Sequence, residues 1–264
     1  MKADVLLDLF YTELPIKDRI NHIADAGWKA VETWMGGDAA ELKEVGNACR
    51  EREVEFVSMV MNFNNDNEVA PVRKTSRAAF LERIDRYSDN ALAAGCSRGI
   101  VTSGDRVTGE DYYTQLQSLT DALAAAAELA GRKGFHLNIE PLNDKVDHPG
   151  YFLVSREEAV SIVRTVASPH LRFLYDLYHQ QIMTGDHTAF LAANIEWVGH
   201  FHAAGVPGRH EIFSGEMDYP YIVRRIREMG YRGYLGLEYM PALEHGESLR
   251  RSVEHLASAL GDAV

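Results

Sequence analysis

The segment GFHLNIEPLND, residues 134–144, alternates apolar and polar side chains and then ends in a carboxylate. Its apolar positions are Phe135, Leu137 and Ile139. Alternation of this kind is typical of a β-strand with one face in an apolar core. Gly134 precedes the run, and glycine is the preferred residue after a helix because it adopts the left-handed conformation without strain. The segment therefore predicts a helix end, a buried strand, and an acidic group, Glu140, at the end of that strand.

The same order of helix, glycine and β-rich run occurs three more times, in DAGWKAVETW, AAGCSRGIVTS and EMGYRGYLGLE. Extending the pattern gives eight predicted strands, near residues 3–9, 29–34, 54–60, 98–103, 135–140, 171–176, 196–202 and 233–238. Helices are predicted at 17–26, 38–52, 76–94, 110–131, 155–167, 186–194, 219–229 and 247–260. Strands that alternate with helices in this way favour an α/β fold, a (β/α)8 TIM barrel that forms one domain over residues 1–264.

Composition excludes several classes of protein. The formal charge of -12 argues against a nucleic-acid surface, which needs clustered Lys and Arg. The N-terminal segment has acidic residues where a signal peptide would be apolar, and no apolar run approaches the ~20 residues of a membrane span, so we expect a cytoplasmic protein. Two cysteines, Cys49 and Cys96, have no metal-type spacing and are predicted to be buried apolar residues.

Four consecutive predicted strands end in residues that bind metals. These residues are Glu140, Asp176, His202 and Glu238, separated by 36, 26 and 36 residues. The carboxyl ends of parallel strands lie on one face of a barrel, where catalytic groups gather, so the four side chains should converge. Three carboxylates so close together would repel one another unless a cation offset their charge. Oxygen ligands with one imidazole favour Mn²⁺ or Mg²⁺, with Co²⁺ or Zn²⁺ as alternatives. The competing interpretation is that each residue separately caps a helix or pairs with a surface cation.

Further residues lie near the same strand ends. His179 follows Asp176 by three residues and is predicted to bind substrate rather than to be an exposed loop histidine. Arg209, in the loop VPGRHE, could bind a carboxylate or hydroxyl, or instead pair with Glu211 or Glu216. Glu32 and Asn62, at the ends of the second and third strands, could contact substrate or be structural. Three aromatic residues could line a pocket or simply pack: Trp34, Phe63 and Tyr11.

Across nearly its whole length the chain resembles the xylose-isomerase-like TIM barrels, above all hydroxypyruvate and 2-oxo-tetronate isomerases. The motifs that carry the resemblance are IEPLN, YDLYHQQ, GHFHAAGVPGRHE, SGEMDYP and GLEYMP. The stretch AGVPGRHE is similar to the isomerase branch, whereas His202 is a feature of the related ketose 3-epimerases. The resemblance implies that Glu140, Asp176, His202 and Glu238 hold the metal and that Glu140 and Glu238 are also the catalytic acid and base. It also implies that His179 and Arg209 contact the substrate oxygens.

The predicted chemistry is proton transfer beside a carbonyl group. One glutamate removes a proton from carbon and the other returns it, while a divalent ion stabilises the enediolate. We expect a metal-dependent isomerase of a small hydroxy-carbonyl acid with no organic cofactor, no membrane partner and no nucleic-acid partner; a homo-oligomer is compatible with the sequence. The alternatives are a ketose 3-epimerase acting on free sugars, a non-catalytic sugar-binding barrel, and an abasic-site endonuclease, which would need several zinc ions and a basic groove.

Overall fold

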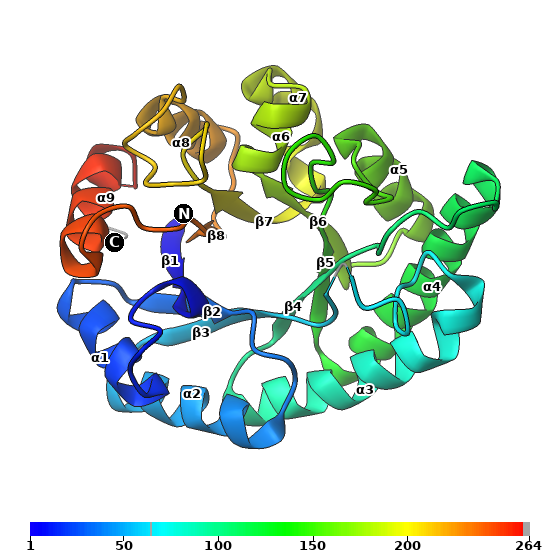
Figure 1. Ribbon diagram of the computed structural model, residues 1–264, viewed down its shortest axis with the longest axis horizontal. Coiled ribbons are helices and arrows are strands. Elements are labelled where there is room, and N and C mark those ends of the chain that lie inside the picture. Colours follow the sequence, from blue (N-terminus) through cyan, green and yellow to red (C-terminus); the bar gives the residue numbers. More distant parts are fainter. Residues whose placement is uncertain (64, 261–264) are drawn as a thin grey trace.

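Eight parallel strands close into a barrel in chain order in a computed structural model that describes residues 1–63 and 65–260 (Figure 1). The strands are β1 (Lys2–Leu6), β2 (Ala30–Thr33), β3 (Glu55–Val60), β4 (Arg98–Val101), β5 (His136–Ile139), β6 (Leu171–Asp176), β7 (Val198–Ala203) and β8 (Tyr234–Leu237). Each predicted strand overlaps one of these. The prediction of a (β/α)8 barrel is confirmed.

Helices form a ring outside the barrel (Figure 1). They are α1 (Ile16–Asp25), α2 (Ala39–Glu51), α3 (Arg77–Ala94), α4 (Tyr112–Lys133), α5 (Arg156–Val166), α6 (Leu177–Met183), α7 (His187–Asn194), α8 (Tyr219–Glu228) and α9 (His245–Leu260). Short 3-10 helices occur at η1 (Leu7–Leu9), η2 (Lys74–Ser76) and η3 (Ile195–Trp197). The main apolar core lies between the helices and the outer faces of the strands, and it includes both cysteines, which are buried and free as predicted.

The glycines that defined the repeat have the expected backbone conformation. Their φ angles are positive: Gly27 97°, Gly95 96°, Gly134 71° and Gly230 96°. At Gly134 an added Cβ would meet no atom within 4 Å, so the left-handed backbone, rather than lack of space, requires glycine there.

Helix α6 is absent from the predicted elements. Asp176 ends β6 and also caps α6, because its carboxylate accepts hydrogen bonds from the backbone N–H groups of Tyr178 (2.6 Å) and His179 (3.2 Å). The strand therefore passes directly into a short helix, with no glycine or proline between them. As a result His179 lies on a helix and is buried.

Strand register places polar residues inside the barrel as well as at its mouth. Asp4 pairs with Gly236, Gly236 with His202, and His202 with Asp176, so these residues face the same side of the sheet. A small apolar cluster of Val60, Ile100 and Leu174 packs beside the polar residues. Four further polar residues are buried on inward-facing positions: Glu32, Ser58, Asn138 and His200.

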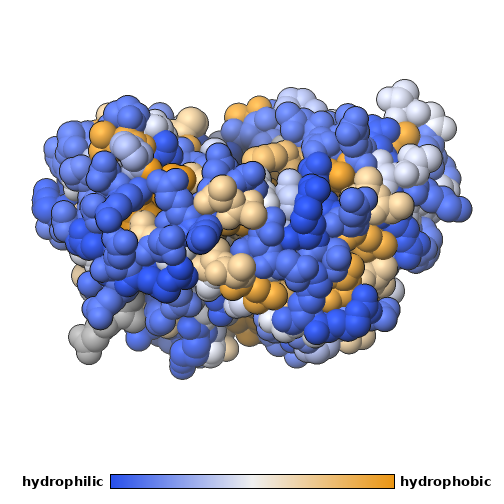
Figure 2. All heavy atoms as spheres, turned by 90° about the horizontal axis from the view of Figure 1, so that it is seen from below, coloured by the Kyte–Doolittle hydropathy of each residue, from blue (hydrophilic) through white to orange (hydrophobic). Residues whose placement is uncertain are grey.

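The outer surface seen in Figure 2 is largely hydrophilic, with small apolar patches between charged side chains. In the described ranges, no helix combines the length and the apolar character needed to cross a membrane.

Candidate active site

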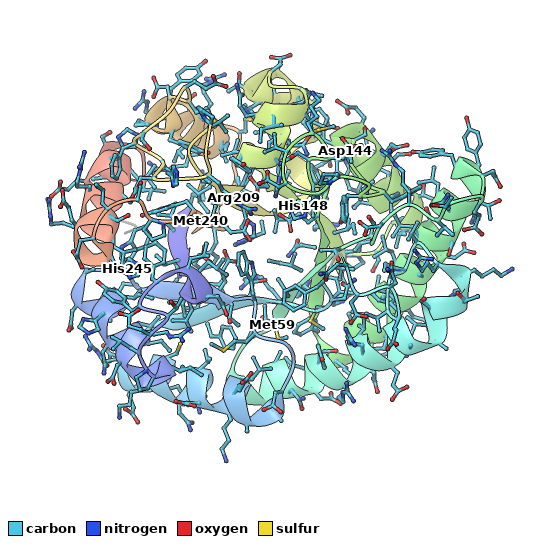
Figure 3. The ribbon with its side chains drawn as sticks, in the orientation of Figure 1. Met59, Asp144, His148, Arg209, Met240 and His245 are labelled. Atoms are coloured by element: carbon cyan, nitrogen blue, oxygen red, sulfur yellow. The ribbon has the colours of Figure 1, made fainter. Side chains whose placement is uncertain are left out.

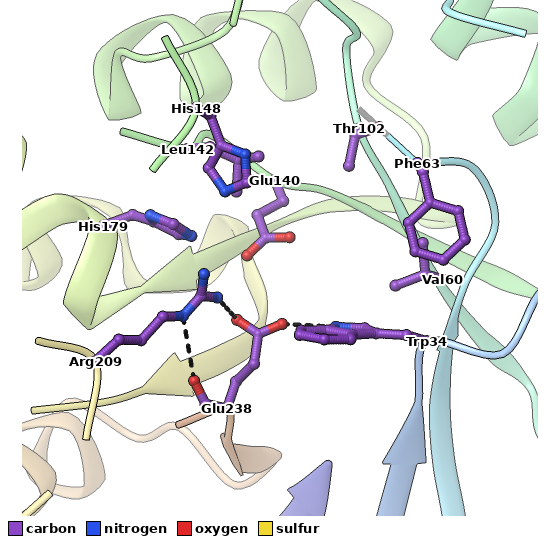
Figure 4. A pocket seen from close by; sticks show the side chains of 10 residues that line it. All are labelled: Trp34, Val60, Phe63, Thr102, Glu140, Leu142, His148, His179, Arg209 and Glu238. Atoms are coloured by element: carbon purple, nitrogen blue, oxygen red, sulfur yellow. Dashed lines mark hydrogen bonds and ion pairs between the residues drawn. The ribbon is translucent and has the colours of Figure 1, made fainter. Parts of the chain in front are cut away.

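A cavity of about 180 Å³ opens at the carboxyl ends of the strands (Figure 4). Its lining residues are Trp34, Val60, Phe63, Thr102, Glu140, Leu142, His148, His179, Arg209 and Glu238. Pockets for drug-sized ligands usually exceed ~300 Å³, so this volume suits a small molecule. The predicted walls Trp34 and Phe63 line the cavity, whereas Tyr11 does not, and its ring stacks on His22 instead.

Three carboxylates converge at the base of the cavity. Glu140, Asp176 and Glu238 each place an oxygen, and His179 a ring nitrogen, so that all four atoms lie within 4.8 Å of one another. His202 also faces this group, because its Nδ1 lies 3.4 Å from Oε1 of Glu140 and 3.4 Å from Oε2 of Glu238. The structure thus brings together the four predicted metal ligands and adds His179 at the edge of the cluster.

Crowding and burial shift the protonation of the carboxylates in different directions. Burial raises the pKa of Asp176 to about 7, and the neighbouring Glu238 and Glu140 contribute to the rise. Burial also raises the pKa of Glu140. Burial acts in the same sense on Glu238, but the Arg209 cation and His202 outweigh it and hold the pKa of Glu238 well below its usual value. The three acids therefore have distinct electrostatic environments.

His202 is surrounded by acids on both sides. Its Nε2 lies 3.0 Å from Oε1 of Glu32, on the side away from the cavity. Burial lowers the pKa of His202, but Glu32 and Glu238 outweigh burial and raise it well above the usual value. Without another cation, a protonated His202 and Arg209 thus offset part of the negative charge.

The donor set fits a divalent cation. Three buried atoms that face the cluster have no hydrogen-bond partner among the described residues: Oε1 of Glu140, Nε2 of His179 and Nδ1 of His202. Buried polar atoms without partners are costly, and convergent carboxylate oxygens with an imidazole nitrogen form a site that Mn²⁺ or Mg²⁺ can fill.

Arg209 and Trp34 hold Glu238 from two sides. The Arg209 guanidinium forms an ion pair with Oε2 of Glu238, and the Trp34 indole N–H donates to Oε1 at 2.8 Å (Figure 4). Arg209 also lies over the Tyr178 ring, with its central carbon 5.2 Å from the ring centroid. Its backbone is left-handed, with φ of 57°. The ion pair with Glu238 replaces the pairing with Glu211 or Glu216 that the sequence left open.

The alternative partners of Arg209 are occupied elsewhere. Glu211 accepts hydrogen bonds from the backbone N–H groups of Ala242 and Leu243, and Glu216 accepts one from Gln181. The interpretation that Arg209 simply pairs with Glu211 or Glu216 is therefore wrong.

His179 is held so that one ring nitrogen faces the acids. Its Nδ1 lies 2.7 Å from Nδ2 of Asn143, and its Nε2 lies 3.4 Å from Oδ2 of Asp176. The side chain is fully buried, which excludes the exposed loop histidine.

Glu32 and Asn62 lie at the site but are absent from the described cavity lining. Both oxygens of Glu32 face histidines beneath the carboxylate cluster. The side-chain amide of Asn62 donates to the backbone carbonyl of Thr102 at 3.0 Å and accepts from its N–H at 3.1 Å. Asn62 therefore joins the ends of β3 and β4.

His148 is a cavity residue that the sequence analysis did not single out. It lies in the loop between β5 and α5 and, like Arg209, on the β6–β8 side of the barrel mouth (Figure 3), where both line the cavity. Its ring contacts that of His179 edge to face, with centroids 5.4 Å apart. The available signal was the turn sequence DHPGY soon after Glu140, because loops that follow barrel strands carry functional groups.

The barrel and its carboxylate-rich mouth define the class of protein. Residues 20–259 match the xylose isomerase-like TIM barrel family, and the chain belongs to that family. It is 32% identical over 237 residues to a 2-oxo-tetronate isomerase of Cupriavidus necator, covering 89% of this chain and 91% of the relative. It is 31% identical over 245 residues to a putative hydroxypyruvate isomerase of Danio rerio, covering 88% and 87%. These relatives confirm the predicted resemblance and an enzyme of the isomerase type.

Solved structures share the fold. A Brucella melitensis protein described as an AP endonuclease of family 2 superposes with a TM-score of 0.87 at 28% identity, over 96% of this chain and 99% of that one. A D-psicose 3-epimerase superposes with a TM-score of 0.84 at 16% identity, over 99% and 100%. At that identity the second likeness concerns the fold alone.

Proposed function

We propose that the chain is a divalent-metal-dependent isomerase of a small hydroxy-carbonyl acid, such as hydroxypyruvate, tartronate semialdehyde or a 2-oxo-tetronate. The carrying observation is the pair Glu140 and Glu238, which face one cavity with oxygens within 4.8 Å of each other. The names of the relatives support the substrate class.

The two glutamates are suited to different steps. Glu238 is anchored by Arg209 and Trp34, whereas Oε1 of Glu140 has no hydrogen-bond partner among the described residues. One glutamate removes a proton from the hydroxyl-bearing carbon beside the carbonyl, and the other delivers a proton to the former carbonyl carbon. In the net reaction one proton moves between the carbons and one between the oxygens, so no redox partner is needed.

The ligands for the metal would be Glu140, Asp176, His202 and Glu238, with His179 directed at substrate. The metal would supply Lewis-acid stabilisation of negative charge on the substrate oxygens. Arg209 would attract the substrate carboxylate. Because it also forms an ion pair with Glu238, its guanidinium would contact both carboxylates. The apolar side of the cavity, with Val60, Phe63 and Leu142, would exclude water from the proton transfer.

Ketose 3-epimerisation is the second candidate, and His202 favours it. A histidine at this position is a feature of the ketose 3-epimerases. An imidazole nitrogen is also a stronger metal ligand than an amide. The two reactions use the same proton-transfer groups and differ in the carbon that is deprotonated. A neutral ketose would depend on hydroxyl-binding groups such as His179 rather than on a cation.

A binding module and an abasic-site endonuclease are less consistent with the site. A binding module has no need for two glutamates beside an unpartnered imidazole. Cleavage of DNA needs a basic groove, which a formal charge of -12 does not favour.

The test is isotope exchange in D₂O. Mn²⁺-loaded protein is incubated with hydroxypyruvate, tartronate semialdehyde, 2-oxo-tetronates and free ketoses, and NMR follows products and deuterium at carbon. We expect exchange and isomerisation of an acid. Faster exchange at C3 of a ketose would favour the epimerase, and no exchange with any compound would contradict both. Glu140→Gln or Glu238→Gln should retain substrate binding but lose exchange, whereas a binding module would be unaffected.

A further inference from the structure

A buried chain of three residues lies directly beneath the carboxylate cluster. Nε2 of His200 is 3.1 Å from Oε2 of Glu32, and Nε2 of His202 is 3.0 Å from Oε1 of the same carboxylate. All three side chains are at most 1% exposed. Glu32 thus lies between two imidazoles: its Oε2 is hydrogen-bonded to His200, and its Oε1 is at ion-pair distance from His202 without hydrogen-bond geometry.

The two ring nitrogens of His202 face different partners. Nε2 points down to Glu32, and Nδ1 points up to Glu140 and Glu238. A neutral imidazole has one N–H and one lone pair, and a partner that accepts the N–H determines which nitrogen has the lone pair. Nε2 of His202 is at ion-pair distance from Glu32, so a neutral, metal-bound His202 with its one N–H on that nitrogen would present the Nδ1 lone pair to the cluster.

Gly236 keeps the space for this contact open. A Cβ at this position would lie 2.1 Å from Oε1 of Glu32 and 2.9 Å from Cδ2 of His202. Gly236 pairs with His202 in the barrel register, so any side chain there would displace Glu32 or the ring. The lack of a side chain at Gly236 therefore leaves room for the Glu32 carboxylate and the His202 ring to lie side by side.

We propose that Glu32 is a positioning residue for the metal centre, holding His202 as the Nε2–H tautomer through a His200–Glu32–His202 chain. The inference rests on the proposed function, because it concerns a ligand of the proposed metal. A carboxylate behind a ligating imidazole orients the ring and strengthens it as a donor, and loss of such a partner typically weakens metal binding by about 10–100-fold. In this proposal Glu32 orients the metal ligand His202 and does not contact the substrate.

The first test measures Mn²⁺ affinity by calorimetry in Glu32→Gln. A glutamine has one carbonyl acceptor for two imidazoles, so either His200 or His202 loses its partner. We expect the Kd for Mn²⁺ to rise by about 10–100-fold. Glu211→Gln is the matched control, because Glu211 is also a buried glutamate but accepts its hydrogen bonds from Ala242, Leu243 and Ser248, outside the His200–Glu32–His202 chain. It should leave the Kd unchanged.

The second test is a double-mutant cycle with His202→Gln. If Glu32 acts through the imidazole, Glu32→Gln should weaken Mn²⁺ binding in the native background and have little further effect in the His202→Gln background. An equal loss in both backgrounds would indicate a structural role and overturn the proposal. A native Kd in Glu32→Gln would overturn it as well.

The third test reads the tautomer directly. Long-range ¹H–¹⁵N correlation of histidine-labelled, Mg²⁺-loaded protein should show Nε2 of His202 protonated and Nδ1 bare, with the signals assigned from His202→Gln. A proton on Nδ1 would overturn the proposal. If Glu32→Gln does not fold, His200→Gln, which leaves both oxygens of Glu32 in place, should give a smaller but measurable rise in Kd. A native protein that binds neither Mn²⁺ nor Mg²⁺ would instead refute the proposed function.

Discussion

The two halves of the barrel mouth differ in chemistry. Strands β2 to β4 and the residues after them contribute Trp34, Val60, Phe63 and Thr102 to the cavity, whereas β5 to β8 contribute Glu140, Asp176, His202 and Glu238 to its base. The apolar half shapes the space and limits water, and the acidic half holds charge and moves protons. Trp34 connects the halves through its hydrogen bond to Glu238. Substitutions in the acidic half should therefore reduce turnover, and substitutions in the apolar half should mainly change substrate affinity.

The largest effect is expected for Glu140→Gln. An amide cannot accept the substrate proton, so kcat should fall by about 10²–10⁴-fold, the typical contribution of a positioned acid or base. Stopped-flow or NMR turnover of the best substrate measures the loss. The control is Glu216→Gln, an acid-to-amide change in an exposed residue outside the cavity lining, which should keep native kcat. Equal kcat values for the two variants would remove Glu140 from the mechanism.

Removal of the metal is the next prediction. Chelation should abolish turnover and lower the melting temperature, because a cation that binds only the folded state stabilises it by about 2.7 kcal/mol at a hundred times its Kd. Thermal melts with and without Mn²⁺ measure the shift. Asp176→Asn, which replaces one of the three clustered acids, should lose most of it. A melting temperature insensitive to Mn²⁺ and full turnover after chelation would contradict the metal assignment.

Arg209→Ala tests the border between the halves. Loss of a charge-assisted contact to the substrate carboxylate should raise KM for the acid by an amount equivalent to roughly 1.5–3 kcal/mol. A neutral ketose should be affected less. Steady-state kinetics with both substrates give the comparison, and an equal loss on acid and ketose would point to the epimerase.

The sequence predicted the barrel well because its signals are local and repeat. Glycine after a helix, followed by a short apolar run, indicates one αβ unit, and Glu140, Asp176 and Glu238 lie within one residue of a strand end. Helix α6 was missed because Asp176 ends a strand and caps a helix at once, so no breaker separates the two patterns.

The depth of a residue in the barrel could not be predicted from strand ends alone. Glu32 pairs with Ser58, two residues before Val60, which lines the cavity. Glu32 therefore lies one layer below the cavity, and Trp34, two residues further on, reaches it. The pairing of Arg209 with Glu238 could not be predicted either, because it depends on the left-handed backbone of Arg209 in an irregular loop.

The smallest effect is expected for Phe63→Ala in the apolar half. The ring is 43% exposed, so its removal should change stability little, but it lines the cavity and would be covered by bound substrate. Loss of that burial should cost on the order of 0.5–1 kcal/mol, raising KM about two- to fivefold with kcat unchanged. Tyr113→Ala is the control, because this ring is 78% exposed in α4 and absent from the described cavity lining. A fall in kcat for Phe63→Ala with unchanged KM would mean that the apolar half takes part in proton transfer, and the division between the two halves would have to be abandoned.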